Sequence, residues 1–253
     1  MSPSEGLALF LAGLGAGFCN VMAGGGSLIS VTMMIFLGLP PTVANATGRP
    51  AIIAQNILAV LGFRRARIYR DPVFRVSTIL LAVAALPGAL AGAYVAATKV
   101  SDVTFQRLLA VVMLGVAIVT WWRFRGGGLG TDPLRERRPV FLLAAFFVMG
   151  FYGGFIQAGV GFFMIAAFLH GSSWDMVRIN AAKVLIVLIY TGAALLVFTG
   201  NWLVDWNAAA WVVAGQAVGG LVGARTALRW PEAAVLKVYL VLLLAFATKL
   251  AFF

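Results

Sequence analysis

Residues 17–27 read Gly-Phe-Cys-Asn-Val-Met-Ala-Gly-Gly-Gly-Ser, and residues 154–161 read Gly-Phe-Ile-Gln-Ala-Gly-Val-Gly. Each stretch opens with Gly-Phe, carries an amide side chain (Asn20 or Gln157) three residues after its first glycine, and has another glycine seven residues after the first. Each also divides an apolar region, and the flanking runs are 7–22, 26–38, 140–157 and 160–170. Irregular backbone is tolerated at membrane depth only where it is buried or lines a cavity. We therefore interpret each pair of short runs as a glycine-broken helix or a hairpin.

The composition around these stretches is that of a membrane protein. Hydrophobic residues make up 62% of the 253 residues and charged residues 11%, whereas soluble domains show about 45–50% and about 25%. The mean hydropathy is +0.99. These values exclude an ordinary soluble domain, a disordered chain and, despite the net charge of +11, a nucleic-acid binder. A helix needs roughly 20 apolar residues to cross a bilayer, and the full-length candidates are 43–62, 76–97, 104–122, 179–199, 206–228 and 235–253.

The basic residues predict the orientation of these spans. Arginines cluster in the connections near 64–75 and 123–138, and further basic residues lie near 178 and 225–237. Because basic loops stay in the cytoplasm, the connections near 98–103 and 200–205 are expected outside, as are both termini. This topology requires each glycine-broken pair to return to the side from which it entered. The first five residues lack a basic n-region, so we expect no cleavable signal peptide.

The two halves of the chain resemble each other. After the glycine stretches, Asn45-Ala46 in the first half matches Asn180-Ala181 in the second, and Gly88–Gly92 matches Gly219–Gly223. Each half has one broken pair and three full spans, an odd number of crossings, so the second half is expected to be inverted. Inverted repeats with broken helices are typical of transporters, with the substrate site near the midplane. Alternatively, the glycines only allow close helix packing.

The predicted fold is therefore an all-α polytopic integral membrane protein. It forms one membrane domain, residues 1–253, and the predicted parts are repeat one (6–122), a basic linker (123–139) and repeat two (140–253).

Two cations fall inside apolar stretches, Arg49 four residues after Asn45 and Lys183 three residues after Asn180. A buried cation at the bilayer centre costs at least ~2.5–3.5 kcal/mol. All eight carboxylates fall in predicted connections or at the start of the chain, so none can compensate. Backbone carbonyls, water or an anionic ligand could, and we hypothesise an anionic ligand. The alternative is that both side chains snorkel to the interface or cap a helix C-terminus.

Other residues could complete such an anion site. The glycines at 24–26 and Ser27 precede a short apolar helix, whose amino end attracts anions, and Gly161 occupies the matching place in the second half. Pro50 disfavours helix at Arg49 and predicts a kink near Asn45 and Thr47. Asn20 and Gln157 could donate hydrogen bonds to a substrate or satisfy the broken backbone locally. The predicted substrate-binding residues are Asn20, Gly24, Gly25, Gly26, Ser27, Asn45, Thr47, Arg49, Gln157, Gly161, Asn180 and Lys183.

Several of these motifs are similar to those of one known family. The glycine-rich segment, Gly38-Leu39-Pro40 and the run from Val43 to Thr47, together with Asn180–Lys183, resemble the TauE/SafE family, also called the toluene-sulfonate uptake permease family. The resemblance covers about residues 6–251. It implies a bacterial inner-membrane carrier of sulfite, sulfonates, sulfoacetate, thiosulfate or related anions. Phe162 and Phe163 depart from the family pattern after the second glycine motif.

The sequence thus predicts a transporter of a small anion, such as sulfite, thiosulfate or sulfoacetate, that works by alternating access. A passive anion channel is the alternative. An intramembrane enzyme is less well supported, because the chain has one histidine, one cysteine and no carboxylate within a predicted span. We expect no catalytic residue, no metal and no cofactor. The expected partners are the anionic substrate, the lipid bilayer and possible further copies of the chain.

Overall fold

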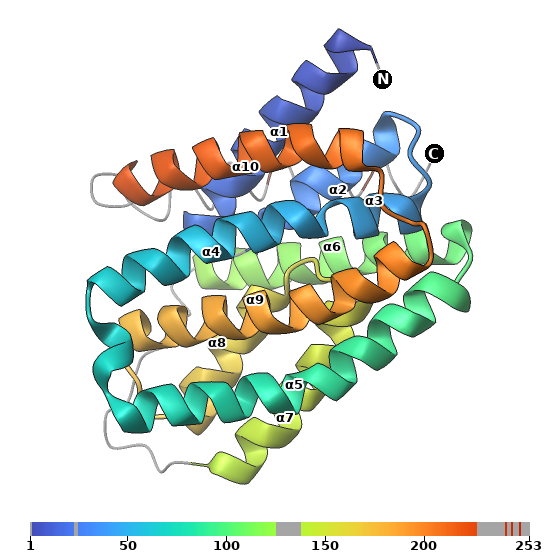
Figure 1. Cartoon of the computed structure of the whole chain (residues 1–253). Coiled ribbons are helices and arrows are strands. Elements are labelled where there is room, and N and C mark those ends of the chain that lie inside the picture. Colours follow the sequence, from blue (N-terminus) through green and yellow to red (C-terminus); the bar gives the residue numbers. More distant parts are fainter. Residues whose placement is uncertain are drawn as a thin grey trace.

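The computed structural model describes residues 2–22, 25–124 and 138–226, together with the single positions Val241, Leu244 and Thr248. This part of the chain is a bundle of helices without strands (Figure 1). In chain order the elements are α1 (Pro3–Met22), α2 (Ser27–Phe36), α3 (Pro41–Thr47), α4 (Arg49–Arg65), the short 3-10 helix η1 (Ile68–Arg70), α5 (Pro72–Thr98), α6 (Asp102–Phe124), α7 (Pro139–Phe155), α8 (Val160–Gly171), α9 (Met176–Gly200) and α10 (Trp206–Thr226).

Most of the predicted spans are single helices. The spans predicted at 76–97, 104–122, 179–199 and 206–228 correspond to α5, α6, α9 and α10. Among the described helices, α5 and α9 are long and apolar enough to cross a bilayer, with 27 and 25 residues and mean hydropathies of 2.1 and 2.2. Of the span predicted at 235–253, the structure describes the single positions Val241, Leu244 and Thr248, and its other residues lie outside the described ranges. So do residues 125–137 of the predicted linker and Gly24.

The span predicted at 43–62 is not continuous, because it divides into α3 and α4 at Gly48. Gly48 keeps right-handed helical torsions, with φ −71° and ψ −18°, so the chain does not turn back here. Pro50 is the second residue of α4. Proline has no N–H group, and the first turn of a helix does not need one. The same missing donor means that α3 cannot continue through residue 50 with an unbroken series of hydrogen bonds.

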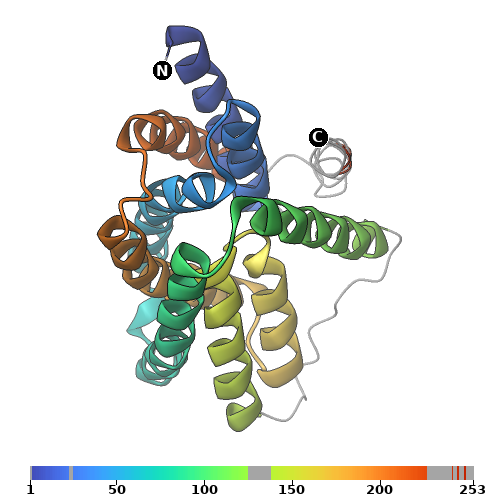
Figure 2. The ribbon, with the colours of Figure 1, turned by 90° about the vertical axis from the view of Figure 1, so that its right-hand side faces the viewer.

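The second glycine-broken pair is a helical hairpin. Gln157 and Gly159 adopt positive φ angles of 67° and 73° and separate α7 from α8. The two helices run side by side (Figure 2), and the amide of Arg138 donates to the carbonyl of Gly171 at 3.0 Å. The start of α7 and the end of α8 therefore meet, as the predicted topology requires. With 12 residues, α8 is about 18 Å long, too short to cross a hydrocarbon core of about 30 Å.

The first broken pair also folds back on itself. A Cβ atom on Gly26 would overlap the carbonyl oxygen of Ala16 and lie 2.7 Å from the backbone nitrogen of Asn20. Glycine is therefore required for α2 to begin against the last turn of α1. The buried apolar residues form two main clusters, one centred on α1, α2 and α6 and one on α5, α7, α8 and α9.

Two helix crossings bring backbone against backbone. In the crossing of α1 with α10, a Cβ atom on Gly17 would overlap the carbonyl oxygen of Gln216, and one on Gly219 would overlap that of Leu14. The crossing of α5 with α7 is built in the same way, because Gly154 faces Ala89 and Gly92 faces Phe151. Small residues allow such approaches between membrane helices. Each crossing joins a helix of the first half of the chain to one of the second.

The two ends of the bundle differ in charge. One end gathers Arg64, Arg65, Arg67, Arg70, Arg75, Arg138 and Arg178; we call it the basic end, on the left in Figure 1. Arg178 pairs with Asp71 at 3.4 Å and joins the start of α9 to the start of α5 there. At the opposite end, Asp102 accepts from the hydroxyl of Thr42 at 2.7 Å. The amide of Asp205 donates to Thr47 Oγ1 at 3.0 Å at this same end.

The close crossing of α1 with α10 predicts that Gly17→Ala destabilises the protein. The added methyl group meets the backbone of α10 and cannot be relieved by a side-chain rotation, so we expect a loss of about 1–3 kcal/mol. Gly15→Ala on the same helix is the matched control, because nothing lies within 4 Å of its Cβ position. Thermal unfolding of the detergent-purified variants measures both. Equal melting temperatures for Gly17→Ala and Gly15→Ala would contradict the close approach of α1 and α10 at Gly17.

Candidate functional site

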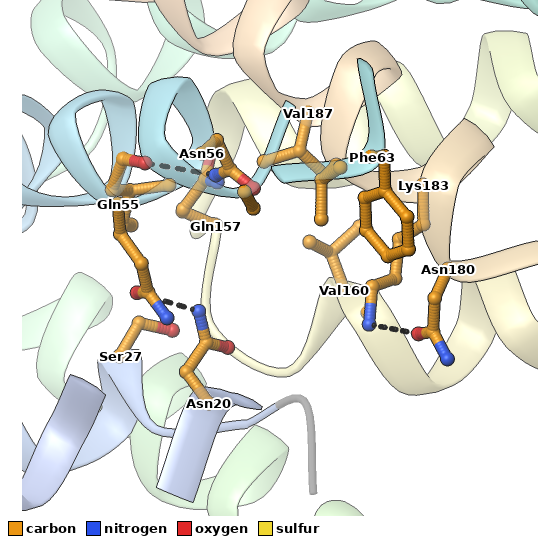
Figure 3. A pocket seen from close by; sticks show the side chains of 14 residues that line it. Asn20, Ser27, Gln55, Asn56, Phe63, Gln157, Val160, Asn180, Lys183 and Val187 are labelled. Atoms are coloured by element: carbon orange, nitrogen blue, oxygen red, sulfur yellow. Dashed lines mark hydrogen bonds between the residues drawn. The ribbon is translucent and has the colours of Figure 1, made fainter. Parts of the chain in front are cut away.

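A cavity of about 210 Å³ lies where the two glycine-broken pairs meet α4 and α9. Figure 3 shows its walls. The end of α1 contributes Asn20, the start of α2 contributes Ser27, and the break between α7 and α8 contributes Gln157. The other lining residues are Ile52, Gln55, Asn56, Ala59, Phe63, Val160, Gly161, Asn180, Lys183, Val184 and Val187. The cavity thus brings together Asn20, Ser27, Gln157, Gly161, Asn180 and Lys183 from the predicted set.

One wall of the cavity is a cluster of amide side chains. Gln55 Oε1 accepts from Asn20 Nδ2 at 2.9 Å and from Gln216 Nε2 at 2.7 Å. Gln55 Nε2 donates to the carbonyl of Gly17 at 3.4 Å. These bonds fix Gln55 between α1 and α10 and hold Asn20 at the cavity wall. Gln216 is fully buried and its Oε1 atom has no hydrogen-bond partner.

Gln157 fixes the second break in a similar way. Its Nε2 atom lies 3.3 Å from the hydroxyl of Tyr190 and 3.1 Å from that of Thr191, both on α9. Its Oε1 atom accepts from Arg49 Nη1 at 3.3 Å. Asn20 and Gln157 therefore each bind a polar side chain on a long helix of their own half. Gln157 thus lines the cavity, and its described side-chain hydrogen bonds go to Arg49, Tyr190 and Thr191 and not to the broken backbone.

Lys183 is the cation of the cavity. Its Nζ donates to Asn180 Oδ1 at 2.9 Å, and both residues are partly buried in the first turns of α9. The described lining includes no aspartate or glutamate. Val160 and Gly161 belong to the first turn of α8, the end of a helix that carries partial positive charge. An ammonium group, amide side chains and a helix amino end favour an anion over a cation.

Arg49 does not line this cavity, although it donates to Gln157 in the cavity wall. Its side chain is completely buried, and its guanidinium carbon lies 4.4 Å from the ring centre of Phe198. Nη1 donates to the carbonyl of Gly153 at 3.2 Å, and Nη2 donates to that of Gly154 at 2.5 Å. Nε has no partner. In this structure the buried charge of Arg49 is therefore compensated by the carbonyl end of α7, where the helix dipole favours a cation.

Arg49 and its neighbours complete the carboxyl end of α7. A helix leaves its last four carbonyls without intrahelical partners. The carbonyl of Tyr152 accepts from the amide of Ile156 at 2.8 Å, Arg49 takes those of Gly153 and Gly154, and Asn45 Nδ2 takes that of Phe155 at 2.9 Å. All four carbonyl groups thus have a hydrogen-bond partner, and the guanidinium of Arg49 is the partner of two of them.

The remaining predicted residues lie away from the cavity. Asn45 Oδ1 is buried without a partner, and the hydroxyl of Thr47 accepts from the amide of Asp205. Gly25 and Gly26 are buried, but they do not line the cavity.

The predicted set of binding residues omits five polar residues in or next to the cavity wall, which are Gln55, Asn56, Tyr190, Thr191 and Gln216. Their signal is that each is a polar side chain inside an apolar run, as at Gln55-Asn56 and Tyr190-Thr191.

The contacts of Arg49 predict that Arg49→Ala strongly destabilises the protein. The change leaves the carbonyls of Gly153 and Gly154 unpaired and opens a void beside Phe198, so we expect a loss of about 2–5 kcal/mol. Arg64→Ala removes an exposed arginine from the same helix and should leave the melting temperature nearly unchanged. Thermal unfolding in detergent compares the two. If Arg49→Ala melts with the wild type, these carbonyls are satisfied in some other way.

Comparison with known proteins identifies relatives along most of the chain. The family described as "Sulfite exporter TauE/SafE" matches residues 9–250. The "Probable membrane transporter protein YfcA" of Escherichia coli (strain K12) is 28% identical over 225 residues, which cover 87% of this chain and 80% of that protein. The "Probable membrane transporter protein ORF9" of Sinorhizobium sp is 26% identical over 220 residues, with shares of 87% and 82%. No solved structure shows a significant match.

Proposed function

Because the chain belongs to the sulfite exporter TauE/SafE family, a family of transmembrane permeases, we propose that it transports a small anion, and that the cavity beside Lys183 is the binding site. A sulfur oxyanion or an organosulfonate is the proposed substrate class. The observation that carries the proposal is the lining of the cavity. It combines Lys183 with the amides of Asn20, Gln157 and Asn180 and no described carboxylate.

The size and the chemistry of the cavity both suit a small oxyanion. Pockets for drug-sized ligands have volumes of about 300–1,000 Å³, whereas this cavity has about 210 Å³. Lys183 supplies positive charge, and the side-chain amides can donate to several oxygens of one ligand. Apolar side chains such as Phe63 and Val187 form the rest of the wall and would accommodate the carbon chain of an organic sulfonate.

We further propose that the two halves form inverted repeats. The reciprocal crossings support this arrangement, since α1 packs on α10 as α7 packs on α5. Gly88 faces Phe147 and Phe151 as Gly215 faces Phe10 and Leu14. Matched by these contacts, Gly88 and Gly92 correspond to Gly215 and Gly219. The sequence match instead paired Gly88–Gly92 with Gly219–Gly223. The contacts therefore shift the pairing by four residues, which is about one helical turn.

The position of the cavity suggests which side has access to it. Its α9 residues, Asn180 to Val187, lie in the half of that helix nearer the basic end, and its α4 residues run from Ile52 to Phe63, close to the basic end of α4. Toward the opposite end, Arg49, Phe198 and Tyr190 are fully buried. If basic loops lie in the cytoplasm, access is from the cytoplasm of a bacterial inner membrane. Alternating access would then require the Arg49 side to open, whereas an open pore would not have this closed half.

The proposed site predicts selective thermal stabilisation of the purified protein by one class of anion. A ligand at about 100 times its dissociation constant should add roughly 2.7 kcal/mol of stability. The panel is sulfite, sulfate, thiosulfate, sulfoacetate, taurine and chloride. Losing a charged hydrogen bond of about 1.5–3 kcal/mol weakens binding about 10- to 100-fold, so Lys183→Ala should reduce the stabilisation at the same anion concentration to about 0.4–1.4 kcal/mol. Lys99→Ala removes a lysine outside the cavity and should keep the shift.

Two outcomes would contradict the proposal. Absence of stabilisation by every anion would rule out the anion site, and an undiminished shift in Lys183→Ala would place the anion elsewhere. In proteoliposomes, the stabilising anion should show saturable uptake and counterflow, which a carrier gives and a passive channel does not. Uptake without counterflow would favour the channel.

A further inference from the structure

A second hollow lies at the basic end, on the outer surface of the bundle and separate from the cavity beside Lys183. It has a volume of about 270 Å³ and lies between the starts of α5 and α7 and the segment that joins α8 to α9. Much of its wall is apolar and includes Leu80, Leu142 and Leu143. Leu80 and Leu143 are 56% and 42% exposed. We call this hollow the α5–α7 groove.

The polar groups of the α5–α7 groove lie at one end of it. Ser172, Ser173 and Trp174 belong to the segment between α8 and α9, and Ser77 lies in the second turn of α5. Trp174 packs against Phe74 and Phe168, with ring centres 4.8 and 5.3 Å apart, so this rim is fixed. An apolar groove with hydroxyls and a tryptophan at its end, close to helix ends, matches a lipid at the membrane–water interface.

Beside the groove, the described carboxylates are paired with an arginine, whereas a second arginine, Arg138, has no described carboxylate partner. Asp71 and Asp175 are the carboxylates of this end in the described ranges, and both contact Arg178, at 3.4 and 4.0 Å. Each also caps a helix, since Asp71 Oδ1 accepts from the amide of Val73 and Asp175 Oδ1 from that of Arg178. Arg138 directly precedes Pro139 in the groove wall. Its described side-chain contact is His170 Nε2 at 3.2 Å, and it has no carboxylate within ion-pair distance in the described chain.

We propose that the α5–α7 groove binds an anionic phospholipid of the leaflet at the basic end. Its acyl chain lies along Leu80, Leu142 and Leu143, and its phosphate lies beside Arg138 and the hydroxyls of the rim. Basic pockets between membrane helices on the cytoplasmic side bind such head groups. The site holds the starts of α5 and α7 and the end of α8 together, whichever solute the protein transports.

Native mass spectrometry of the full chain in neutral detergent tests the site. The probes are dioleoyl phosphatidylglycerol and dioleoyl phosphatidylcholine in equal amounts. The wild type should retain phosphatidylglycerol preferentially, and Arg138→Gln should lower its preference about fivefold, the effect of one basic residue near anionic lipid. Arg75→Gln is the control, because Arg75 lies at the same end but about 200° around α5 from both Val73 and Ser77, which line the groove. It should keep the preference.

A second pair of variants tests whether the lipid occupies the groove itself. Leu80→Trp fills the groove from an exposed position and should reduce the retention of phosphatidylglycerol. Leu90→Trp adds the same bulk at a 43% exposed position of α5 outside the groove and should not. Equal retention of the two lipids by the wild type would overturn the proposal. So would an equal loss in Arg75→Gln and Arg138→Gln, or unchanged retention in Leu80→Trp.

Discussion

The carboxyl end of α7 imposes the constraint on which the rest of the structure depends. A helix that stops inside a membrane protein leaves carbonyl groups that lipid cannot satisfy, and each costs several kcal/mol if it stays unpaired. Arg49 and Asn45 supply the donors for three of these groups. Both come from the kinked segment of the other half of the chain, so closing the end of one broken helix fixes the kink of another.

The same contacts separate the surroundings of Arg49 from those of Lys183. Arg49 and Lys183 look alike in the sequence, since each follows an asparagine by one helical turn inside an apolar run. In the structure the guanidinium binds helix carbonyls, whereas the ammonium group lines the cavity with Asn180. A planar guanidinium with several donors suits neighbouring carbonyls, and a compact ammonium on a flexible stem suits a ligand that must leave. Arg49 thus completes a helix end, and Lys183 lies in the wall of the proposed substrate site.

The helical fold and the broken pairs could be predicted from the sequence, because apolar run lengths and glycine spacing determine them locally. The partners of the glycine faces could not, because Gly17 meets Gln216 of the other half of the chain. The division at Gly48 was only partly predictable. Pro50 predicts a kink, but run length alone gives one span. The separation of Arg49 from Lys183 could not be predicted, because it depends on the carbonyls of Gly153 and Gly154, more than 100 residues away in the chain. Gln55 and Gln216 meet at the wall of the cavity for the same kind of reason, since they are 161 residues apart.

The crossing of α1 with α10 also sets an order of events during synthesis. The glycine face of α1 has no partner until α10 has been made, about 200 residues later. At about 5–20 residues per second, Gly17 and its neighbours wait on the order of ten seconds or more without their native contact. During that interval the small-residue face of α1 is open to lipid, to other helices of the chain or to the insertion machinery. The closure of α1 onto α10 is therefore a late step of assembly.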